Sequence, residues 1–195
     1  MSAYPAPGKR PDLLRHVRST LVSSGIAAIR QRGRFDDYAA ALDPASRELL
    51  VTTVAGAWLP VELVVTHYRA CDTIQLTHDE VVGIGVEVGA RAQDNVLQAV
   101  KRIAAGVGVT PWSLAAQYDR FWPRMFDGGG FRISRLGPKD GTIELLQCPL
   151  AESSYFRSAF CGVNLAGLNL LASKAYVRIQ SRPAPHGFTI RLSWV

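Results

Sequence analysis

Histidine and cysteine side chains are considered first, because they ligate metals and take part in nucleophilic and acid–base chemistry. The chain has four histidines, at 16, 67, 78 and 186, and three cysteines, at 71, 148 and 161. His67 and Cys71 are four residues apart, so on a helix they would share one face at the spacing of two metal ligands. No CxxC, HExxH or second His/Cys pair accompanies them, and Cys71 falls on an apolar stripe, where a thiol usually acts as a small buried hydrophobe. The sequence therefore predicts no metal site.

Catalytic constellations are also missing from the pattern. No GxSxG elbow is present, and none of the histidines stands in a recognisable triad context. Carboxylates are paired at Asp36-Asp37 and Asp79-Glu80, but sequence neighbours point apart on a helix, and the second pair fits a helix cap. We therefore name no catalytic residue.

The one glycine run is Asp127-Gly128-Gly129-Gly130. It lies between a predicted helix end and a predicted strand, and no GK[ST] follows it. A phosphate-binding loop has its glycines between a strand and a helix N-terminus, which is the opposite order. The run is therefore interpreted as a connector, and no nucleotide cofactor is expected.

Aromatic residues are the remaining candidates for a site. They concentrate in the helical part of the chain and at its junction with the first predicted hairpin. Tyr68 and Cys71 share the apolar stripe of one predicted helix, and Tyr118 and Trp122 are neighbours at i, i+4 on another. We expect these four residues to line a ligand pocket between the helices and the sheet, with a filled core as the alternative.

Several helices follow from spacing and caps. Val61, Val64, Val65, Tyr68 and Cys71 repeat at helical spacing after Pro60. Residues 82–89 alternate like a strand, but a Thr-x-x-Glu capping box at 77–80 and a later 3.6-residue period predict one helix over 77–105.

Two glycines within this predicted helix, Gly85 and Gly89, would let a neighbouring helix approach closely. A further helix is predicted from Thr110-Pro111 to Trp122, ended by Pro123.

The C-terminal part reads as two hairpins separated by a helix of roughly 154–173. Apolar and polar residues alternate over 131–136, 142–145, 175–179 and 188–192, which is typical of half-buried strands. The predicted fold class is α+β, with a helical N-terminal two thirds packed on a four-stranded antiparallel sheet. The predicted division is a flexible basic lead over 1–15 and a single α+β domain over 16–195.

Composition limits the function classes. The chain of 195 residues is 48% hydrophobic and 19% charged, which suits one globular domain. An odd number of widely spaced cysteines fits reduced thiols, so we expect a cytoplasmic protein with no disulfide framework. The most apolar stretch, 49–65, is interrupted by two threonines, a proline and a glutamate, so we expect no membrane span. Residues 1–34 hold seven lysines and arginines and one aspartate, which accounts for the whole net charge of +6. No aromatic residues are interleaved with these charges, so nucleic acid is not an expected partner.

Ser113 to Val195 resembles an uncharacterised bacterial paralogous family that is best populated in myxobacteria. The residues that carry the resemblance are Tyr118, the turn 137–141, Cys148-Pro149, Tyr155 with Gly162, and Trp194. The element order is also similar to a wider superfamily that includes the vinyl-reductase-type domain, the haem–nitric-oxide-binding domain and vesicle-tethering subunits. That resemblance implies an α+β fold with a ligand cavity under the sheet.

The haem-binding version of this fold needs a proximal histidine before the first hairpin and a Tyr-x-Ser-x-Arg motif on the sheet. Residues 111–126 contain no histidine, and Tyr155-Phe156-Arg157-Ser158 has the right residue types in the wrong order. The resemblance therefore gives no reason to expect haem. Tethering subunits are acylated on a helix cysteine, and Cys71 lies on a predicted helix, but nothing in the sequence shows that the two are equivalent.

The sequence is best interpreted as a non-enzymatic sensor or adaptor domain with no cofactor. Its expected partner is a small apolar ligand, another protein, or a second copy of the chain in a homodimer. Two alternatives stay open: an enzyme acting on a hydrophobic small molecule in the same cavity, and a nucleic-acid or membrane adaptor that uses the basic N-terminus.

Overall fold

The computed structural model describes residues 11–104, 110–181 and 185–195, and only the backbone of 92–104. The N-terminal part is mostly helical, and its elements are β1 (His16–Arg18), α1 (Ser19–Gln31), α2 (Phe35–Ala40), α3 (Pro44–Thr52), β2 (Trp58–Pro60), α4 (Val61–Thr73) and α5 (His78–Ala104). The C-terminal part alternates helices and hairpins, with α6 (Pro111–Ala115), α7 (Tyr118–Met125), β3 (Phe126–Asp127), β4 (Gly130–Gly137), β5 (Asp140–Leu146), η1 (Pro149–Glu152), α8 (Ser154–Leu168), β6 (Ala175–Ser181) and β7 (Phe188–Trp194).

The main sheet confirms the predicted fold class. Its strand order is β4-β5-β7-β6, and every pair is antiparallel. A row of isoleucines crosses it in register, from Ile133 through Ile143 and Ile190 to Ile179. The alternation seen in the sequence directs one face of β5 and of β7 inward, where Ile143 and Ile190 are fully buried, whereas no residue of β6 is buried.

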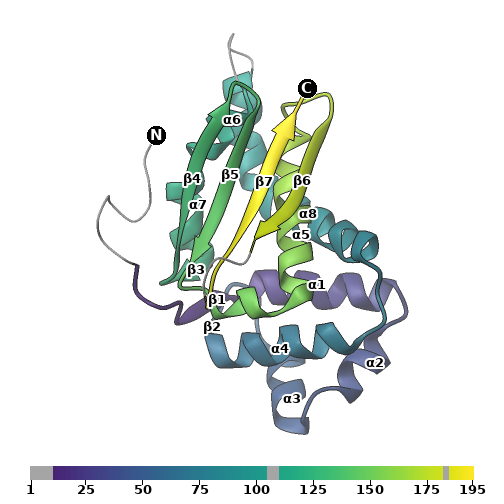
Figure 1. Cartoon of the computed structure of the whole chain (residues 1–195). Helices are drawn as coiled ribbons and strands as arrows, with labels where there is room; N and C mark the ends of the chain where they lie inside the picture. The colour runs from purple at the N-terminus through teal and green to yellow at the C-terminus, as the bar shows by residue number, and fades with distance from the viewer. Residues whose placement is uncertain (1–10, 105–109, 182–184) are drawn as a thin grey trace.

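The elements form layers on one face of this sheet (Figure 1). Helix α8 packs on β6 and β7, α5 packs on α8, and α1 packs on α5. Helices α1 to α4 gather at the end of the molecule where β1, β2 and β3 form a second, smaller sheet. The buried side chains of all these layers belong to one hydrophobic core.

The chain is already anchored before the predicted start of the domain at residue 16. The Leu14 amide donates to the carbonyl oxygen of Gln147 at 2.9 Å, and the Leu14 side chain is buried. The Gly129 amide donates to the carbonyl oxygen of Asp12 at 2.9 Å. Gly128 has φ +89°, and a Cβ there would overlap the Leu13 carbonyl oxygen, so the glycine run lets the N-terminal segment lie against β3. The packed segment therefore includes residues 12–15, and residues 1–10 lie outside the described part.

Helix α5 resolves the ambiguity of residues 77–105 in favour of the cap. The Thr77 amide donates to Glu80 Oε2 at 2.7 Å, and the Glu80 amide donates to Thr77 Oγ1 at 3.3 Å. This reciprocal capping box starts a helix that runs to Ala104, so the strand-like alternation of 82–89 is overridden. Residues 105–109, which include the last position of the predicted helix, lie outside the described residues.

The predicted continuous helix from Thr110 to Trp122 is wrong. It is two helices, α6 and α7, and Pro123 lies inside α7 instead of ending it. Trp112 on α6 is held at the β4–β5 hairpin, because its Nε1 donates to the Pro138 carbonyl oxygen at 2.7 Å. The aromatic side chains of α7 point instead into the core. Because the chain breaks between the two helices, α6 can face the hairpin while α7 faces the core.

Glycines fix the distance between α5 and α8. A Cβ on Gly85 would overlap the backbone carbonyl of Ala159, and one on Gly162 would overlap the carbonyl oxygen of Val82. A Cβ on Gly89 would lie 3.0 Å from Val163 Cα, which is a tight contact. The predicted close helix contact is thus confirmed, and it includes a glycine from each helix.

Replacing Gly85 by Ala should destabilise the fold by about 1–3 kcal/mol, because the two backbones must separate to admit the methyl group. The matched control is Gly83→Ala in the same helix, where the nearest atom to a new Cβ is the flexible Arg32 guanidinium at 3.6 Å. That change should stabilise the protein by up to about 1 kcal/mol through helix propensity. Urea unfolding of both variants measures the difference, and equal stabilities would contradict the contact.

Candidate functional site

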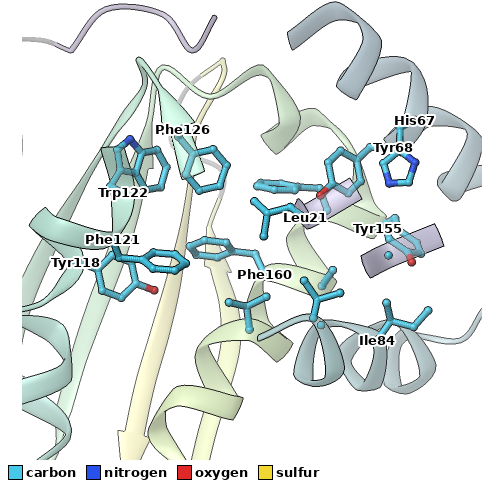
Figure 2. A pocket seen from close by; sticks show the side chains of 16 residues that line it. Leu21, His67, Tyr68, Ile84, Tyr118, Phe121, Trp122, Phe126, Tyr155 and Phe160 are labelled. Carbon is cyan, nitrogen blue, oxygen red and sulfur yellow. The ribbon is translucent and has the colours of Figure 1, made fainter. Parts of the chain in front are cut away.

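A pocket lies where α1, α4, α5, α7 and α8 meet beside β3 (Figure 2). Its wall is almost entirely aromatic and aliphatic, and the lining residues are Leu21, Gly25, His67, Tyr68, Ile84, Gly85, Val88, Tyr118, Phe121, Trp122, Phe126, Tyr155, Phe156, Ala159, Phe160 and Val163. We call this the aromatic pocket. Three of the four predicted ligand-binding residues, Tyr68, Tyr118 and Trp122, are brought together in it.

The cavity is small, at about 60 Å³. An enclosed water needs at least about 10–15 Å³ of such space, so a few water molecules would fit. Ordinary ligand sites have volumes of roughly 300–1,000 Å³. The aromatic pocket as it stands therefore has room only for a molecule of a few heavy atoms.

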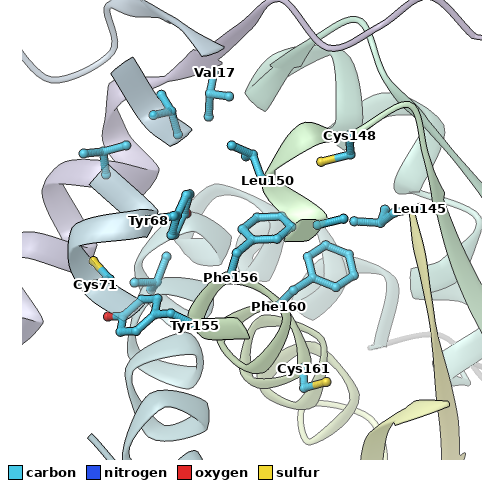
Figure 3. Close-up of a cluster of buried hydrophobic side chains, with 14 of the residues drawn as sticks. Val17, Tyr68, Cys71, Leu145, Cys148, Leu150, Tyr155, Phe156, Phe160 and Cys161 are labelled. Carbon is cyan, nitrogen blue, oxygen red and sulfur yellow. The ribbon is translucent and has the colours of Figure 1, made fainter. Parts of the chain in front are cut away.

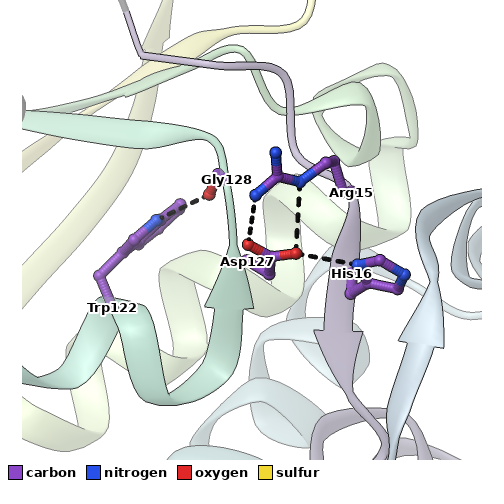
Figure 4. A network of polar contacts seen from close by, with 5 residues as sticks. All are labelled: Arg15, His16, Trp122, Asp127 and Gly128. Carbon is purple, nitrogen blue, oxygen red and sulfur yellow. Dashed lines mark hydrogen bonds and ion pairs between the residues drawn. The ribbon is translucent and has the colours of Figure 1, made fainter.

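Trp122 is held rigidly at one side of the pocket. Its indole Nε1 donates to the Gly128 carbonyl oxygen at 3.1 Å, and its ring stacks on Phe126 with centroids 4.3 Å apart. The connector that carries Gly128 is fixed next to a polar network in which Asp127 binds Arg15 and His16, at 2.8 and 2.9 Å (Figure 4). The Arg15 hydrogen bond, aided by His16, lowers the pKa of Asp127 to about 2.

Tyr118 is anchored one turn before Trp122. Its hydroxyl donates to Asn164 Oδ1, and the Asn164 amide donates to the Phe160 carbonyl oxygen at 2.8 Å. Burial raises the pKa of the Tyr118 hydroxyl, so it stays protonated. The polar atom of Tyr118 is therefore used inside the protein, and its ring forms part of the apolar wall.

Cys71, the fourth predicted residue, is not among the lining residues of the pocket. It lies on the α4 side of Tyr155, close to the hydroxyl of that tyrosine (Figure 3). Its Sγ is 3.8 Å from Nε2 of His67, whose Nδ1 is hydrogen-bonded to the Tyr38 hydroxyl at 2.8 Å. Burial raises the pKa of the Cys71 thiol and lowers the pKa of His67 to about 3, so both are neutral near pH 7.

The His67–Cys71 pair does not form a metal centre within the described residues, where no group of three or more His, Cys, Asp or Glu side chains gathers. Two ligands leave a zinc site incomplete. The pair is instead a polar layer at the α4 side of the pocket. His67 lines the pocket, and Cys71 contacts His67 from behind the wall.

Sequence reasoning missed the contribution of α5 and α8 to the pocket. Tyr155, Phe156, Ala159, Phe160 and Val163 all line it from α8. Their spacing at i, i+1, i+4, i+5 and i+8 is that of one broad helix face, so the signal was present in the sequence. The wall from α1 carries no comparable signal, because Leu21 and Gly25 are ordinary core residues.

The arginines of the basic N-terminal segment contact groups of the same chain. The contacts are Arg15 with Asp127, Arg18 with the Trp58 ring, Arg30 with the Phe35 ring, Arg32 with Glu87, and Arg34 with Asp37. The arginines of residues 11–34 thus form ion pairs and cation–π contacts within the chain. Lys9 and Arg10 lie outside the described residues.

Solved structures with a similar fold are haem–nitric-oxide-binding (H-NOX) domains. A Fe(II) unliganded H-NOX protein from K. algicida has a TM-score of 0.64 at 9% identity, covering 91% of this chain and 96% of that chain. An oxygen-binding H-NOX domain related to soluble guanylate cyclases has a TM-score of 0.57 at 9% identity, covering 91% and 94%. No protein-family model matches the chain, and no curated protein is similar to it. The likeness confirms the fold that the element order indicated.

Haem does not fit the residues of this chain. Helices α6 and α7, which precede the first hairpin of the main sheet, contain no histidine, and the one histidine in the pocket wall is His67 on α4. Its Nδ1 is bound to Tyr38, and its Nε2 faces the side of Gly25 and Cys71. A cavity of about 60 Å³ beside the stacked Trp122 and Phe126 leaves no volume for a porphyrin.

Protein expressed with added haem should therefore show no stoichiometric Soret band after gel filtration. The reason is that α7 has no histidine to ligate the haem iron and that side chains fill the volume around Trp122. An absorbance scan of wild type and His67→Ala measures this. A stoichiometric band in wild type that disappears in His67→Ala would contradict the haem-free pocket.

Proposed function

We propose that this protein is a non-enzymatic sensor or adaptor domain that binds a small apolar molecule in the aromatic pocket. The observation that carries the proposal is the pocket wall itself, in which aromatic and aliphatic side chains line a cavity between five helices. An empty apolar cavity costs stability, because its lining loses dispersion contacts. A small apolar molecule that fills it would be bound by recovering those contacts.

The wall favours a binder over an enzyme. None of its residues is an aspartate, glutamate, lysine, arginine, serine or cysteine. Its histidine is neutral, because burial lowers the pKa of His67 to about 3, and its tyrosines are held protonated by pKa values raised by burial. General acid–base catalysis works best with groups whose pKa lies near the operating pH. An enzyme acting on a hydrophobic molecule in this cavity remains the alternative.

The other proposed partners have less support. The arginines over 11–34 are engaged within the chain, which weakens the case for a nucleic-acid or membrane adaptor. None of the helices in the described residues combines the length and apolar character that a membrane crossing requires. A protein partner, a homodimer, a cytoplasmic location and the likeness to the bacterial paralogous family stay predictions.

Methyl NMR of the labelled protein, titrated with cycloalkanes from cyclopropane to cyclohexane, tests the proposal. The smallest members should shift the methyl signals of Ile84, Val88 and Leu21, and the effect should disappear as size increases, because the cavity is small. The methyls of Ile190, which is buried but does not line the pocket, serve as an internal control.

Leu21→Phe should fill the pocket and abolish these shifts. The matched control is Leu49→Phe, which makes the same change at a side chain that is 55% exposed and outside the pocket. Absence of shifts for every cycloalkane, or equal binding by both variants, would contradict the proposed function.

A further inference from the structure

Tyr68 differs from three of the other polar residues of the pocket wall. It is 8% exposed, and its hydroxyl makes no hydrogen bond within the described part of the chain, whereas Tyr118, Trp122 and His67 each have a hydrogen-bond partner there. Figure 2 shows this hydroxyl directed toward Leu21 and the interior of the pocket. A tyrosine hydroxyl that faces a cavity and donates to no protein atom is free to donate to a ligand held there.

A second lining tyrosine provides the contrast. The Tyr155 hydroxyl is fully buried and has no partner among the described residues, but it points toward the side of Cys71, behind the pocket wall (Figure 3). Tyr68 and Tyr155 lie next to each other, with ring centroids 6.2 Å apart. Of these two unpartnered hydroxyls, the one on Tyr68 is therefore placed to reach a molecule in the cavity.

We infer that the aromatic pocket takes a small neutral molecule with an apolar body and one hydrogen-bond acceptor, such as a short ketone, aldehyde or ether, and that the Tyr68 hydroxyl donates to that acceptor. This inference rests on the proposed function and specifies its ligand class. Charged ligands are excluded, because the wall offers no opposite charge and an unpaired charge in an apolar site is strongly unfavourable. A phenol that stays neutral supplies one directional donor, which is enough for a ligand of a few heavy atoms.

The probes are acetone and isobutene, which share shape and size but differ in one atom, a carbonyl oxygen in place of a methylene. Binding of both is measured by methyl NMR to wild type, Tyr68→Phe and Tyr155→Phe. In Tyr68→Phe, acetone binding should weaken roughly 2- to 10-fold, the range of one net hydrogen bond, and isobutene binding should not weaken. Tyr155→Phe removes a hydroxyl from the same wall and should leave the acetone-to-isobutene affinity ratio unchanged.

Tyr68→Phe should fold as well as wild type, because its hydroxyl has no partner to lose among the described residues, and its melting temperature checks this. If isobutene binds to wild type but the acetone-to-isobutene ratio is the same in Tyr68→Phe, the ligand class is wrong and the proposed function stands. If neither probe binds to wild type, both are overturned. A ratio that falls equally in Tyr155→Phe would also overturn the assignment to Tyr68.

Discussion

The close contact between α5 and α8 is the constraint on which the rest of the structure depends. Gly85 and Gly162 face each other across it, and side chains at either position would overlap backbone of the other helix. Because α8 also packs on β6 and β7, the contact fixes the position of α5 relative to the main sheet. On one side of this crossing, Ile84 and Val88 from α5 and Ala159 and Val163 from α8 become walls of the aromatic pocket.

A fold similar to that of H-NOX domains is compatible with a different interior. The fold positions helices around a central space, and the side chains decide what that space holds. Here Trp122 and Phe126 are stacked in it, and Tyr118 is tied to Asn164 on α8. What remains is a cavity of about 60 Å³, so the ligand that we propose is far smaller than a porphyrin.

The sequence predicted the elements whose signals are local. Alternation predicted the four strands of the main sheet, the capping box at Thr77 and Glu80 predicted α5, and Gly85 and Gly89 predicted a close helix contact. The break between α6 and α7 was not predictable from caps, because it arises from Trp112 binding the hairpin while Trp122 binds the core. Cys71 was placed in the site because it shares a helical stripe with Tyr68, but the stripe packs on more than one neighbour, and spacing alone does not say which residue faces the cavity.

The most direct test of the account is a crystal structure of the protein under xenon pressure. Apolar cavities that are dry and accessible bind xenon. We expect a xenon atom inside the aromatic pocket, between Tyr68, Ile84 and Trp122, with the surrounding side chains unmoved. A pocket that shows no xenon because its side chains have closed it, or one that holds haem, would contradict the claim that this fold surrounds a small apolar binding site.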